Sequence, residues 1–510
     1  MCLETSGDVP GQDVQGRALL MATPAPQDTT AGLQLRLGWG SLLVLGVANI
    51  LGAGVYVLIG TAASLYAGPA VTISFLIAGA SCLLVGLCYA ELASSVPESG
   101  SAYSYCKHTL GIGPAWALGW LLFLEFSVAA SLLAVGFSGY FGSLLADLGL
   151  VLPQAISTPA VQLLPGGDGK SLVFTGNANL VAAGAVLLAG AIVALGTSRS
   201  SLANIILVVV KVLVLVSFIV VGAMAVDPGN WSPFLPPNEG GFTYGWEGVA
   251  RAASLLFFAF LGFETVSTAA AETRNPQRDV PIGILGSLAI CATLYVLAAI
   301  VLTGLVPFRE LDVPDPIAVA VDRIGWPQFA VVIKIGALAG LASVLLANAF
   351  GHSRVCYAMS RDGLLPDVFK RLHPTRNSLW IANLLLAALA AINAALLPIS
   401  VMADLVTFGV ALMFAMVATS LIRLRSTQPE RLGRFRVPLG GVRIGGIWFG
   451  VVPVLAILMS FAMTLPVALD IVQQARNGDL LPIVLLGAYA VIGALLYRFY
   501  GRARALQRNA

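Results

Sequence analysis

Charged side chains are scarce in this chain of 510 residues, and histidine is almost missing. Charged residues make up 10% of the chain and hydrophobic residues 58%, and there are three histidines and six cysteines. A soluble chain of this length would need a far more polar surface, so the composition indicates a polytopic membrane protein. The scattered cysteines lack metal-ligand spacing, so we expect no disulfide, no metal site and no cofactor. No catalytic triad or HExxH-type motif is present, which argues against an enzyme.

Long apolar segments predict twelve membrane-spanning helices. Such segments must be helical in lipid, because every backbone polar group there needs an internal partner. The predicted spans cover residues 39–60, 69–91, 114–146, 179–196, 202–226, 249–271, 281–306, 328–358, 378–397, 401–424, 446–468 and 481–500. We therefore expect an all-α polytopic membrane protein, with one helical domain over residues 39–500 surrounded by the lipid bilayer.

Basic residues gather on one side of the predicted spans, chiefly within residues 361–376, 423–443 and 498–508. Because cytoplasmic loops carry an excess of Lys and Arg, this pattern places both termini in the cytoplasm. Residues 1–38 are polar and rich in Gly, Pro, Gln and Thr, which predicts a disordered cytoplasmic tail without a secretory signal. Residues 501–510 form a second cytoplasmic tail. The net charge of +3 reflects this topology, and we expect no nucleic acid and no obligate protein partner.

One short motif resembles the end of a phosphate-binding loop. It reads GGDGKS at Gly166–Ser171, but that motif needs a glycine at position 164, where the chain has Leu164. The segment also lies in a predicted external loop, where ATP is not available. We therefore expect no nucleotide site here.

Glycines interrupt two predicted spans that lie five spans apart. The first is ILGAGVYV at Ile50–Val57, with Gly52 and Gly54, and the second is FFAFLGFET at Phe257–Thr265, with Gly262. An odd number of spans reverses the direction of the second set, so matched interruptions predict an inverted-repeat transporter with its site at the two breaks. Glycines that let helices approach closely are the alternative explanation.

The residues around these interruptions resemble the amino acid–polyamine–organocation superfamily, and within it the bacterial branch of the cationic amino acid transporters. The resemblance covers most of residues 36–500 and rests on ILGAGVYVLIG (Ile50–Gly60), PESGSAYSYCKHTLG (Pro97–Gly111), FFAFLGFETVSTAAAETRNPQRDVP (Phe257–Pro281) and RVCYAMSRDGLLP (Arg354–Pro366). Ile112 stands where relatives often carry a glutamate, which leaves the preference for cationic substrates open.

The resemblance implies a five-plus-five inverted-repeat fold (LeuT-like) with two additional helices. The first repeat would cover residues 39–226, the second repeat residues 249–424, and helices 11 and 12 residues 446–500.

We expect the substrate to bind at the two breaks. A helix N-terminus exposes unpaired N–H groups, so the half-helix that starts near Ala53 and Gly54 would hold an α-carboxylate. Backbone carbonyls at Ile50 and in the second break would accept hydrogen bonds from the α-ammonium. By resemblance, Phe258 lies over the substrate, although a ring that faces lipid or core is the alternative. The predicted substrate-binding residues are Ile50, Gly52, Ala53, Gly54, Phe258, Ala259, Phe260, Leu261 and Gly262.

A lone lysine, Lys211, lies near the centre of the fifth predicted span in NIILVVVKVLVLVS. A charged lysine at mid-bilayer costs about 2.5–3.5 kcal/mol, so it needs a partner or a wet cavity. We expect it to interact, directly or through water, with Glu125 in the third span. Resemblance to proton-driven relatives implies that Lys211 carries the coupling proton and ties the fifth span to the first and eighth. A lysine that snorkels to the interface is the alternative.

Charged residues close to the ends of the sixth and eighth predicted spans are candidates for gating. These are Glu264, just beyond Gly262, and the adjacent Arg361 and Asp362 in SRDGLLP. Such residues could form links that differ between transport states. Plain solvated loops are the alternative.

The sequence thus predicts a secondary active transporter that moves amino acids, with cationic ones among the candidates, across the plasma membrane by proton symport. A proton-independent exchanger of amino acids or polyamines is the alternative within transport. A membrane-embedded enzyme would need a catalytic motif, and a nutrient sensor would need a signalling domain or a long tail. We expect neither.

Overall fold

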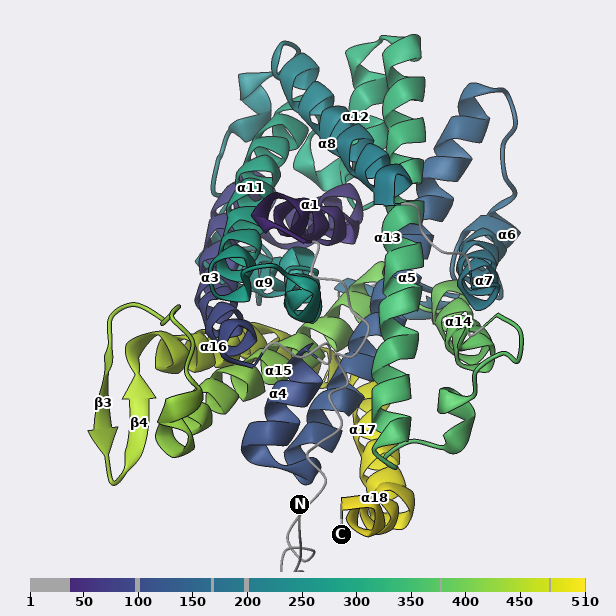
Figure 1. The fold of residues 1–510 in the computed structure, drawn as a ribbon. Helices are drawn as coiled ribbons and strands as arrows, with labels where there is room; N and C mark the ends of the chain where they lie inside the picture. The colour runs from purple at the N-terminus through teal and green to yellow at the C-terminus, as the bar shows by residue number, and fades with distance from the viewer. Residues whose placement is uncertain are drawn as a thin grey trace, which may run out of the picture.

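The computed structural model describes residues 37–96, 101–166, 169–196, 201–376, 378–476 and 478–509. These residues form a helical bundle with two short antiparallel hairpins (Figure 1). Residues 1–36 lie outside the described residues, so the predicted N-terminal tail stays a prediction. Leu37, the first described residue, pairs with the segment after α10, where its N–H donates to the Glu272 carbonyl at 3.2 Å.

Two of the long helical segments are interrupted in the middle. The first consists of α1 (Trp39–Ile50), a π-helical turn (Gly54–Leu58), α2 (Ile59–Ala62) and a second π-helical turn (Ala63–Ala67). The other consists of α9 (Gly245–Phe257), a 3₁₀ turn (Phe258–Phe260) and α10 (Glu264–Thr268).

The other long helices run without such a break. They are α3 (Val71–Ser95), α5 (Ile112–Asp147), α8 (Ser201–Ala223), α11 (Pro276–Leu305), α13 (Pro327–Arg361), α15 (Ile399–Thr427) and α16 (Val451–Arg476). The last segment is α17 (Leu481–Leu496), which continues through a π-helical turn (Tyr497–Gly501) into α18 (Arg502–Asn509). Shorter helices are α4 (Ser101–Leu110), α6 (Gln154–Ser157), α7 (Leu180–Ala194), α12 (Pro316–Ile324) and α14 (Trp380–Leu396).

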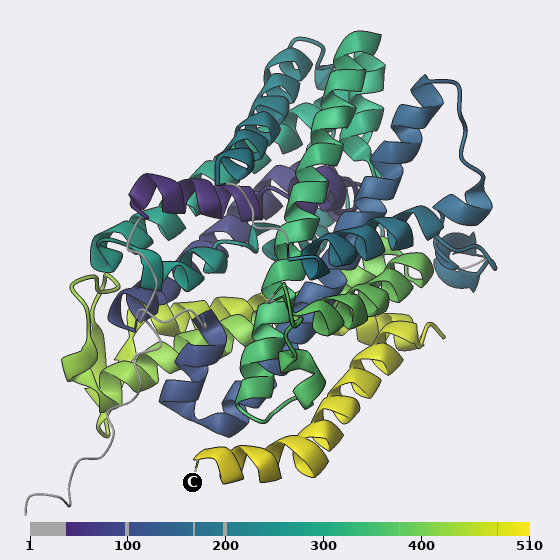
Figure 2. The same cartoon turned by 45° about the vertical axis from the view of Figure 1, so that its right-hand side comes forward.

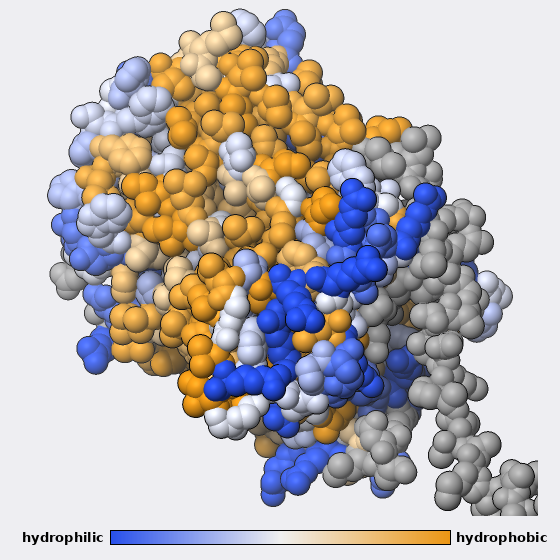
Figure 3. Space-filling model, turned by 60° about the vertical axis from the view of Figure 1, so that its left-hand side comes forward, coloured by the Kyte–Doolittle hydropathy of each residue, from blue (hydrophilic) through white to orange (hydrophobic). Residues whose placement is uncertain are grey.

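Within the described residues, nine helical stretches are long and apolar enough to cross a membrane. One of them, Trp39–Ser95, is 57 residues long and contains both the interrupted first helix and α3. The shorter helices α7 and α14 are also apolar. Figure 3 shows a broad hydrophobic surface on one side of the molecule, as expected for helices that face lipid.

The long helices cross at different angles and bury a common core. Helix α13 packs along α5, and α1 packs against α11. Figure 2 shows α13 running steeply across the direction of α1. Because α13 crosses the bundle in this way, it reaches both the first break and the end of the molecule that carries α4, α18 and the β3–β4 hairpin (Figure 1).

Two short hairpins add strands to the fold predicted as all-α, which is otherwise helical in the described residues. Strands β3 (Gly441–Ile444) and β4 (Ile447–Gly450) pair across a turn at Gly445 and Gly446, which have φ of +57° and +83°. The predicted eleventh span, 446–468, begins too early, because residues 447–450 form a strand and α16 begins at Val451 and continues to Arg476. Strands β1 (Val161–Gly166) and β2 (Gly169–Phe174) form the other hairpin, in the predicted external loop. Residues 502–509 of the predicted C-terminal tail are helical.

Candidate substrate site

Helix α1 stops in the middle of the molecule. Its last residue is Ile50, the backbone leaves the helical region at Leu51 (φ −69°, ψ 89°), and helical structure resumes at Gly54. The break leaves carbonyl oxygens near the end of α1 without helical partners. Side chains of two other helices donate hydrogen bonds to them, from Lys211 on α8 and Tyr295 on α11.

The second break follows α9 and depends on Gly262. Leu261 is extended (ψ 148°), and Gly262 has a φ of +116°, a backbone conformation that residues with a Cβ rarely adopt. Helix α10 begins at Glu264, whose side-chain Oε2 accepts a hydrogen bond of 2.8 Å from the Gly262 N–H. A carboxylate at this position suits the partial positive charge of a helix N-terminus.

The two breaks are in direct contact with each other. A Cβ added at Gly54 would lie 2.5 Å from the Cβ of Ala259, and a Cβ added at Gly262 would lie 2.5 Å from the carbonyl carbon of Asn49. Contacts this short are not possible between real side chains and backbone. Both glycines are therefore needed for the approach of two interrupted backbones, in addition to any effect on helix propensity.

A cavity lies where the breaks meet, lined by both interrupted helices, α5 and α13. Its lining residues are Asn49, Ile50, Gly52, Ala53, Gly54, Glu125, Phe126, Ala129, Leu133, Phe258, Ala259, Leu261, Gly262, Glu264, Thr265, Val344, Ala347, Asn348 and Gly351. The structure thus brings together eight of the nine residues predicted to bind substrate. The cavity has no Lys or Arg among these described residues.

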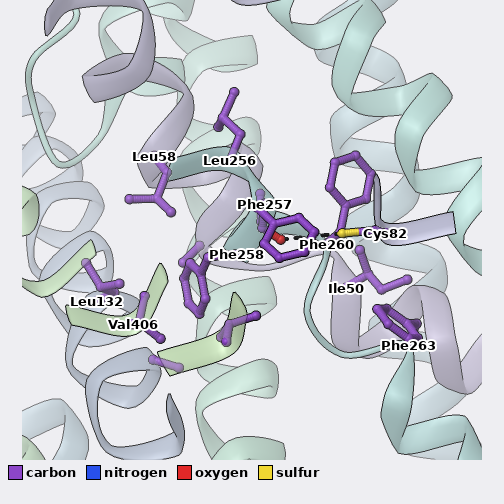
Figure 4. Packing of buried hydrophobic residues seen from close by; sticks show 14 of the residues in the cluster. Ile50, Leu58, Cys82, Leu132, Leu256, Phe257, Phe258, Phe260, Phe263 and Val406 are labelled. Carbon is purple, nitrogen blue, oxygen red and sulfur yellow. Dashed lines mark hydrogen bonds between the residues drawn. The ribbon is translucent and has the colours of Figure 1, made fainter. Parts of the chain in front are cut away.

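Phe260 is the predicted binding residue that does not line the cavity. Its side chain is fully buried, and its ring centroid lies 5.3 Å from that of Tyr295 and 6.4 Å from that of Phe75. Phe258, in contrast, lines the cavity. In Figure 4, Phe258 lies on the side of Leu132 and Val406, whereas Cys82 and Phe263 lie on the other side. Within this turn, only one of the two rings can therefore reach a ligand.

Two carboxylates face the cavity, from Glu125 on α5 and Glu264 on α10. Both side chains are buried. Glu264 has the Gly262 N–H as a partner, whereas Oε2 of Glu125 has no hydrogen-bond partner among the described residues, and the same is true of Oδ1 of Asn348. The cavity therefore presents two unoccupied acceptors, which suits a ligand that carries hydrogen-bond donors.

Lys211 lies at the first break, but it does not contact Glu125 in the described part of the chain. Its Nζ donates to the carbonyl oxygen of Ala48 and, at 3.4 Å, to that of Leu51. Its Cβ lies 3.4 Å from the position of a Cβ added at Gly340 on α13. Lys211 thus hydrogen-bonds to the end of the first helix and lies beside α13, the helices that the resemblance implied, while the direct pairing with Glu125 is wrong. Contact through water stays a prediction.

Tyr295 is a site residue that sequence reasoning missed. Its hydroxyl donates to the Ile50 carbonyl at 2.6 Å and also lies 3.2 Å from the Ala259 carbonyl, so one side chain of α11 bridges both breaks. The side chain is completely buried. No motif marks this residue, because a single tyrosine in an apolar helix is ordinary core packing.

The predicted gating residues lie in two separate places. Asp362, just after α13, accepts hydrogen bonds from Lys107 Nζ at 2.8 Å and from the Tyr103 hydroxyl at 2.7 Å, both on α4. Burial and the Asp362 carboxylate raise the pKa of the Tyr103 hydroxyl above its usual range. Arg361 is the last residue of α13. Glu264 instead lines the central cavity, so these residues do not form one cluster.

A buried ion network joins α9 to two further helices. The guanidinium of Arg251 pairs with Asp404 on α15 and, at 2.8 Å, with Asp470 on α16. It also lies 4.6 Å from the ring centroid of Tyr66. Arg251 has no exposed surface, so this charge depends entirely on its protein partners.

Comparisons with known proteins agree with this geometry. The chain matches the amino acid permease family over residues 37–494. It is 39% identical to the methylthioribose transporter of Bacillus subtilis over 423 residues, which cover 82% of this chain and 87% of that protein. It is 38% identical to the branched-chain amino acid permease BcaP of the same organism over 472 residues, 92% of this chain and 94% of that protein.

A plant relative supports the resemblance to cationic amino acid transporters. The chloroplastic cationic amino acid transporter 9 of Arabidopsis thaliana is 39% identical over 361 residues, which cover 69% of this chain and 61% of that protein. Relatives of this name and the family match confirm the resemblance to the amino acid–polyamine–organocation superfamily. The chain belongs to the amino acid permease family of this superfamily.

Proposed function

We propose that the chain is a secondary active transporter that carries an amino acid across the plasma membrane together with protons. The observation that supports this most is the meeting of two interrupted helices at one cavity, with Gly54 against Ala259. Irregular backbone at membrane depth is tolerated where it lines a cavity, and it is the usual way in which secondary transporters build a substrate site.

We also propose twelve spans arranged as two inverted sets of five, with helices α16 and α17 added and both termini cytoplasmic. The apolar helices support this number. There are nine long apolar stretches among the described residues, one of them holds two helices, and the shorter α7 and α14 add two more. The two breaks support the repeat, because they fall in the first helix of each proposed set. The basic loops support the orientation.

The site offers complementary groups to an amino acid. The half-helix that begins at Gly54 starts at the cavity wall, and its first backbone N–H groups would hold the α-carboxylate. Acceptors on the other walls, such as Glu125 and Asn348, would bind an ammonium or another donor. The names of the relatives include branched-chain amino acids, cationic amino acids and methylthioribose, and these are the substrate types to compare in uptake.

Lys211 would couple this site to protons. Charge-assisted hydrogen bonds from its ammonium hold α8 against the end of α1, through the carbonyls of Ala48 and Leu51. Loss of the proton would weaken these bonds and release α1 from α8. The proton would thus control the helix whose break forms the substrate site.

Uptake into proteoliposomes tests this function. We would offer labelled isoleucine, arginine, putrescine and methylthioribose, with and without an inward proton gradient. Accumulation of an amino acid that requires the gradient and disappears with a protonophore is the expected result. If uptake occurs only into liposomes that are preloaded with substrate, and if the pH gradient has no effect on it, the protein is the alternative exchanger. No uptake of any amino acid under either condition would overturn the proposal.

A further inference from the structure

The β3–β4 hairpin has one fully apolar face. Its register pairs Val442 with Phe449 and Ile444 with Ile447, and side chains that pair across antiparallel strands lie on the same face. All four are exposed, with fractions of 65%, 39%, 65% and 43% respectively. This face therefore exposes two adjacent apolar pairs on the surface of the protein. A contiguous exposed apolar patch is typical of a surface that contacts a membrane or another molecule.

The opposite face of the hairpin is docked on the end of α15. Trp448 on this face is buried, and its ring centroid lies 4.0 Å from the guanidinium carbon of Arg425. The backbone N–H of Trp448 donates to Ser426 Oγ at 2.9 Å. The hairpin is thus attached by one face only. Its orientation on the protein is fixed by Trp448, and the apolar face must point away from α15.

The segment that leads into the hairpin is equally fixed. Glu91 on α3 accepts hydrogen bonds from the guanidinium of Arg425 at 2.5 and 2.6 Å and from the Val437 N–H at 2.6 Å. Glu91 has no exposed surface. A buried bidentate pair of this kind holds its geometry well. The apolar face is therefore a positioned surface and not the by-product of a loose loop.

Positive charge gathers in the segment that contains the hairpin. Residues 423–450 contain six arginines and one acidic residue, Glu430. Five of these arginines are exposed, namely Arg423, Arg431, Arg434, Arg436 and Arg443. Figure 3, which brings this side of the molecule forward, shows hydrophilic side chains beside hydrophobic ones on its lower part. Apolar and cationic groups side by side are typical of a surface that lies in an anionic membrane interface.

We propose that the apolar face of the β3–β4 hairpin docks into the cytoplasmic leaflet of the bilayer and that the exposed arginines bind phosphate groups of anionic lipids. Helix α15 ends at Thr427, and α16 begins at Val451, directly after β4. Because both are spanning helices, the hairpin cannot lie far from the membrane surface. The charge of the cytoplasmic leaflet is complementary to the arginines. This inference rests on the orientation given with the proposed function.

Hydrogen exchange of the full chain in lipid nanodiscs tests the proposal. The peptide over residues 439–451 is compared in nanodiscs of phosphatidylcholine alone and in nanodiscs that also contain phosphatidylglycerol. We expect exchange to be about tenfold slower with the anionic lipid, and the difference to shrink at high salt. The variant R434Q/R436Q/R443Q should lose the lipid dependence, and V442S/I444S should exchange faster than wild type in the anionic nanodiscs.

A matched control removes the same charge elsewhere. The variant R498Q/R502Q/R504Q changes three arginines of the C-terminal helical segment and should keep the full lipid effect on the hairpin. Equal exchange of the wild-type hairpin in both lipids would overturn the proposal and favour a protein as the partner of this face. Retention of the lipid effect in R434Q/R436Q/R443Q would also overturn it. Uptake measured on the same wild-type protein is an independent readout, so equal exchange in both lipids together with intact uptake would overturn the docking and leave the proposed function standing.

Discussion

Gly54 and Gly262 are glycines for different physical reasons, although each sits at a break. Gly54 begins a π-helical turn without a positive φ, and what excludes a side chain there is Ala259, whose Cβ, Cα and carbonyl oxygen all lie less than 3 Å from an added Cβ. Gly262 faces the same kind of close approach, from Asn49, and in addition its φ of +116° excludes residues with a Cβ. Gly262 is thus constrained by its backbone as well as by its neighbour, and Gly54 by its neighbour alone.

Even the smallest substitution at Gly54 should therefore abolish substrate binding. Gly54→Ala would push apart the two backbones that form the cavity, at a cost of about 1–3 kcal/mol for overpacking. Gly184→Ala on α7 is the control, because a Cβ there meets no atom within 4 Å. Thermal-shift titration with a transported amino acid measures the effect in both variants. Wild-type affinity in Gly54→Ala would mean that the breaks do not form the binding site.

Tyr295→Phe should lower stability by about 1–3 kcal/mol, because it leaves the buried carbonyls of Ile50 and Ala259 without their donor. The matched control is Tyr89→Phe, which removes an equally buried hydroxyl that has no partner among the described residues. Thermal unfolding of the two variants in the same detergent provides the comparison. If both variants unfold at the same temperature, the hydroxyl of Tyr295 does not hold the breaks together.

Lys211→Met should lose accumulation driven by a pH gradient and keep substrate binding, since the cavity is lined by other helices. Lys211→Arg should fail in the same way, because arginine does not release a proton at any relevant pH. Lys370→Met, which removes a partly exposed lysine next to Asp367, is the control and should transport normally. The measurement is uptake with and without the gradient. Undiminished gradient-driven accumulation in Lys211→Met would contradict the coupling role.

At the scale of elements, α4 and the end of α13 are joined by Asp362 with Lys107 and Tyr103. If this link closes the side of the cavity that we propose to be cytoplasmic in one transport state, breaking it should change the rate of transport more than the affinity. A double-mutant cycle of Lys107→Ala and Asp362→Ala should give a coupling of about 0.2–1 kcal/mol in the maximal uptake rate.

The local pair Asp367–Lys370 is a suitable control for this cycle, because it lies within one short turn and joins no two long elements. The corresponding alanine cycle should show no coupling in the uptake rate. Equal coupling in both pairs would mean that general surface charge, and not the α4–α13 link, sets the rate.

The sequence predicted the interrupted helices well because glycine at membrane depth has a direct physical consequence. The sequence does not show which way a side chain faces around its helix, so it could not predict the contact partners of side chains on neighbouring helices. Glu125 and Lys211 have similar depth in their spans, which suggested a pair, but Lys211 turns toward Ala48 and Glu125 toward the cavity. Tyr295 and Asn348 were missed for the same reason. The β3–β4 hairpin was missed because its apolar residues, such as Ile447 and Phe449, read as the start of a span.

For the whole molecule, the orientation in the membrane gives a direct prediction. The five cysteines that the structure describes are all buried, so a cysteine introduced at an exposed position can be labelled selectively once Cys2 is replaced by serine. Val151, which is 84% exposed after α5, should react with an impermeant thiol reagent in intact cells as Val151→Cys. Arg504→Cys should react only after permeabilisation. The reverse pattern would invert the proposed topology.

The buried network of Arg251, Asp404 and Asp470 limits how this molecule can change shape. Separating the arginine from its partners would strand a charge with no water around it, at a cost of about 3–5 kcal/mol. Helix α9, α15 and α16 must therefore travel as one rigid unit or stay at rest together. If the cavity opens on alternate sides, we expect the hinge to lie beyond Phe257, in the unwound stretch that ends at Gly262. Helix α16 therefore belongs to the same rigid body as α9 and α15, whether that body moves or stays at rest.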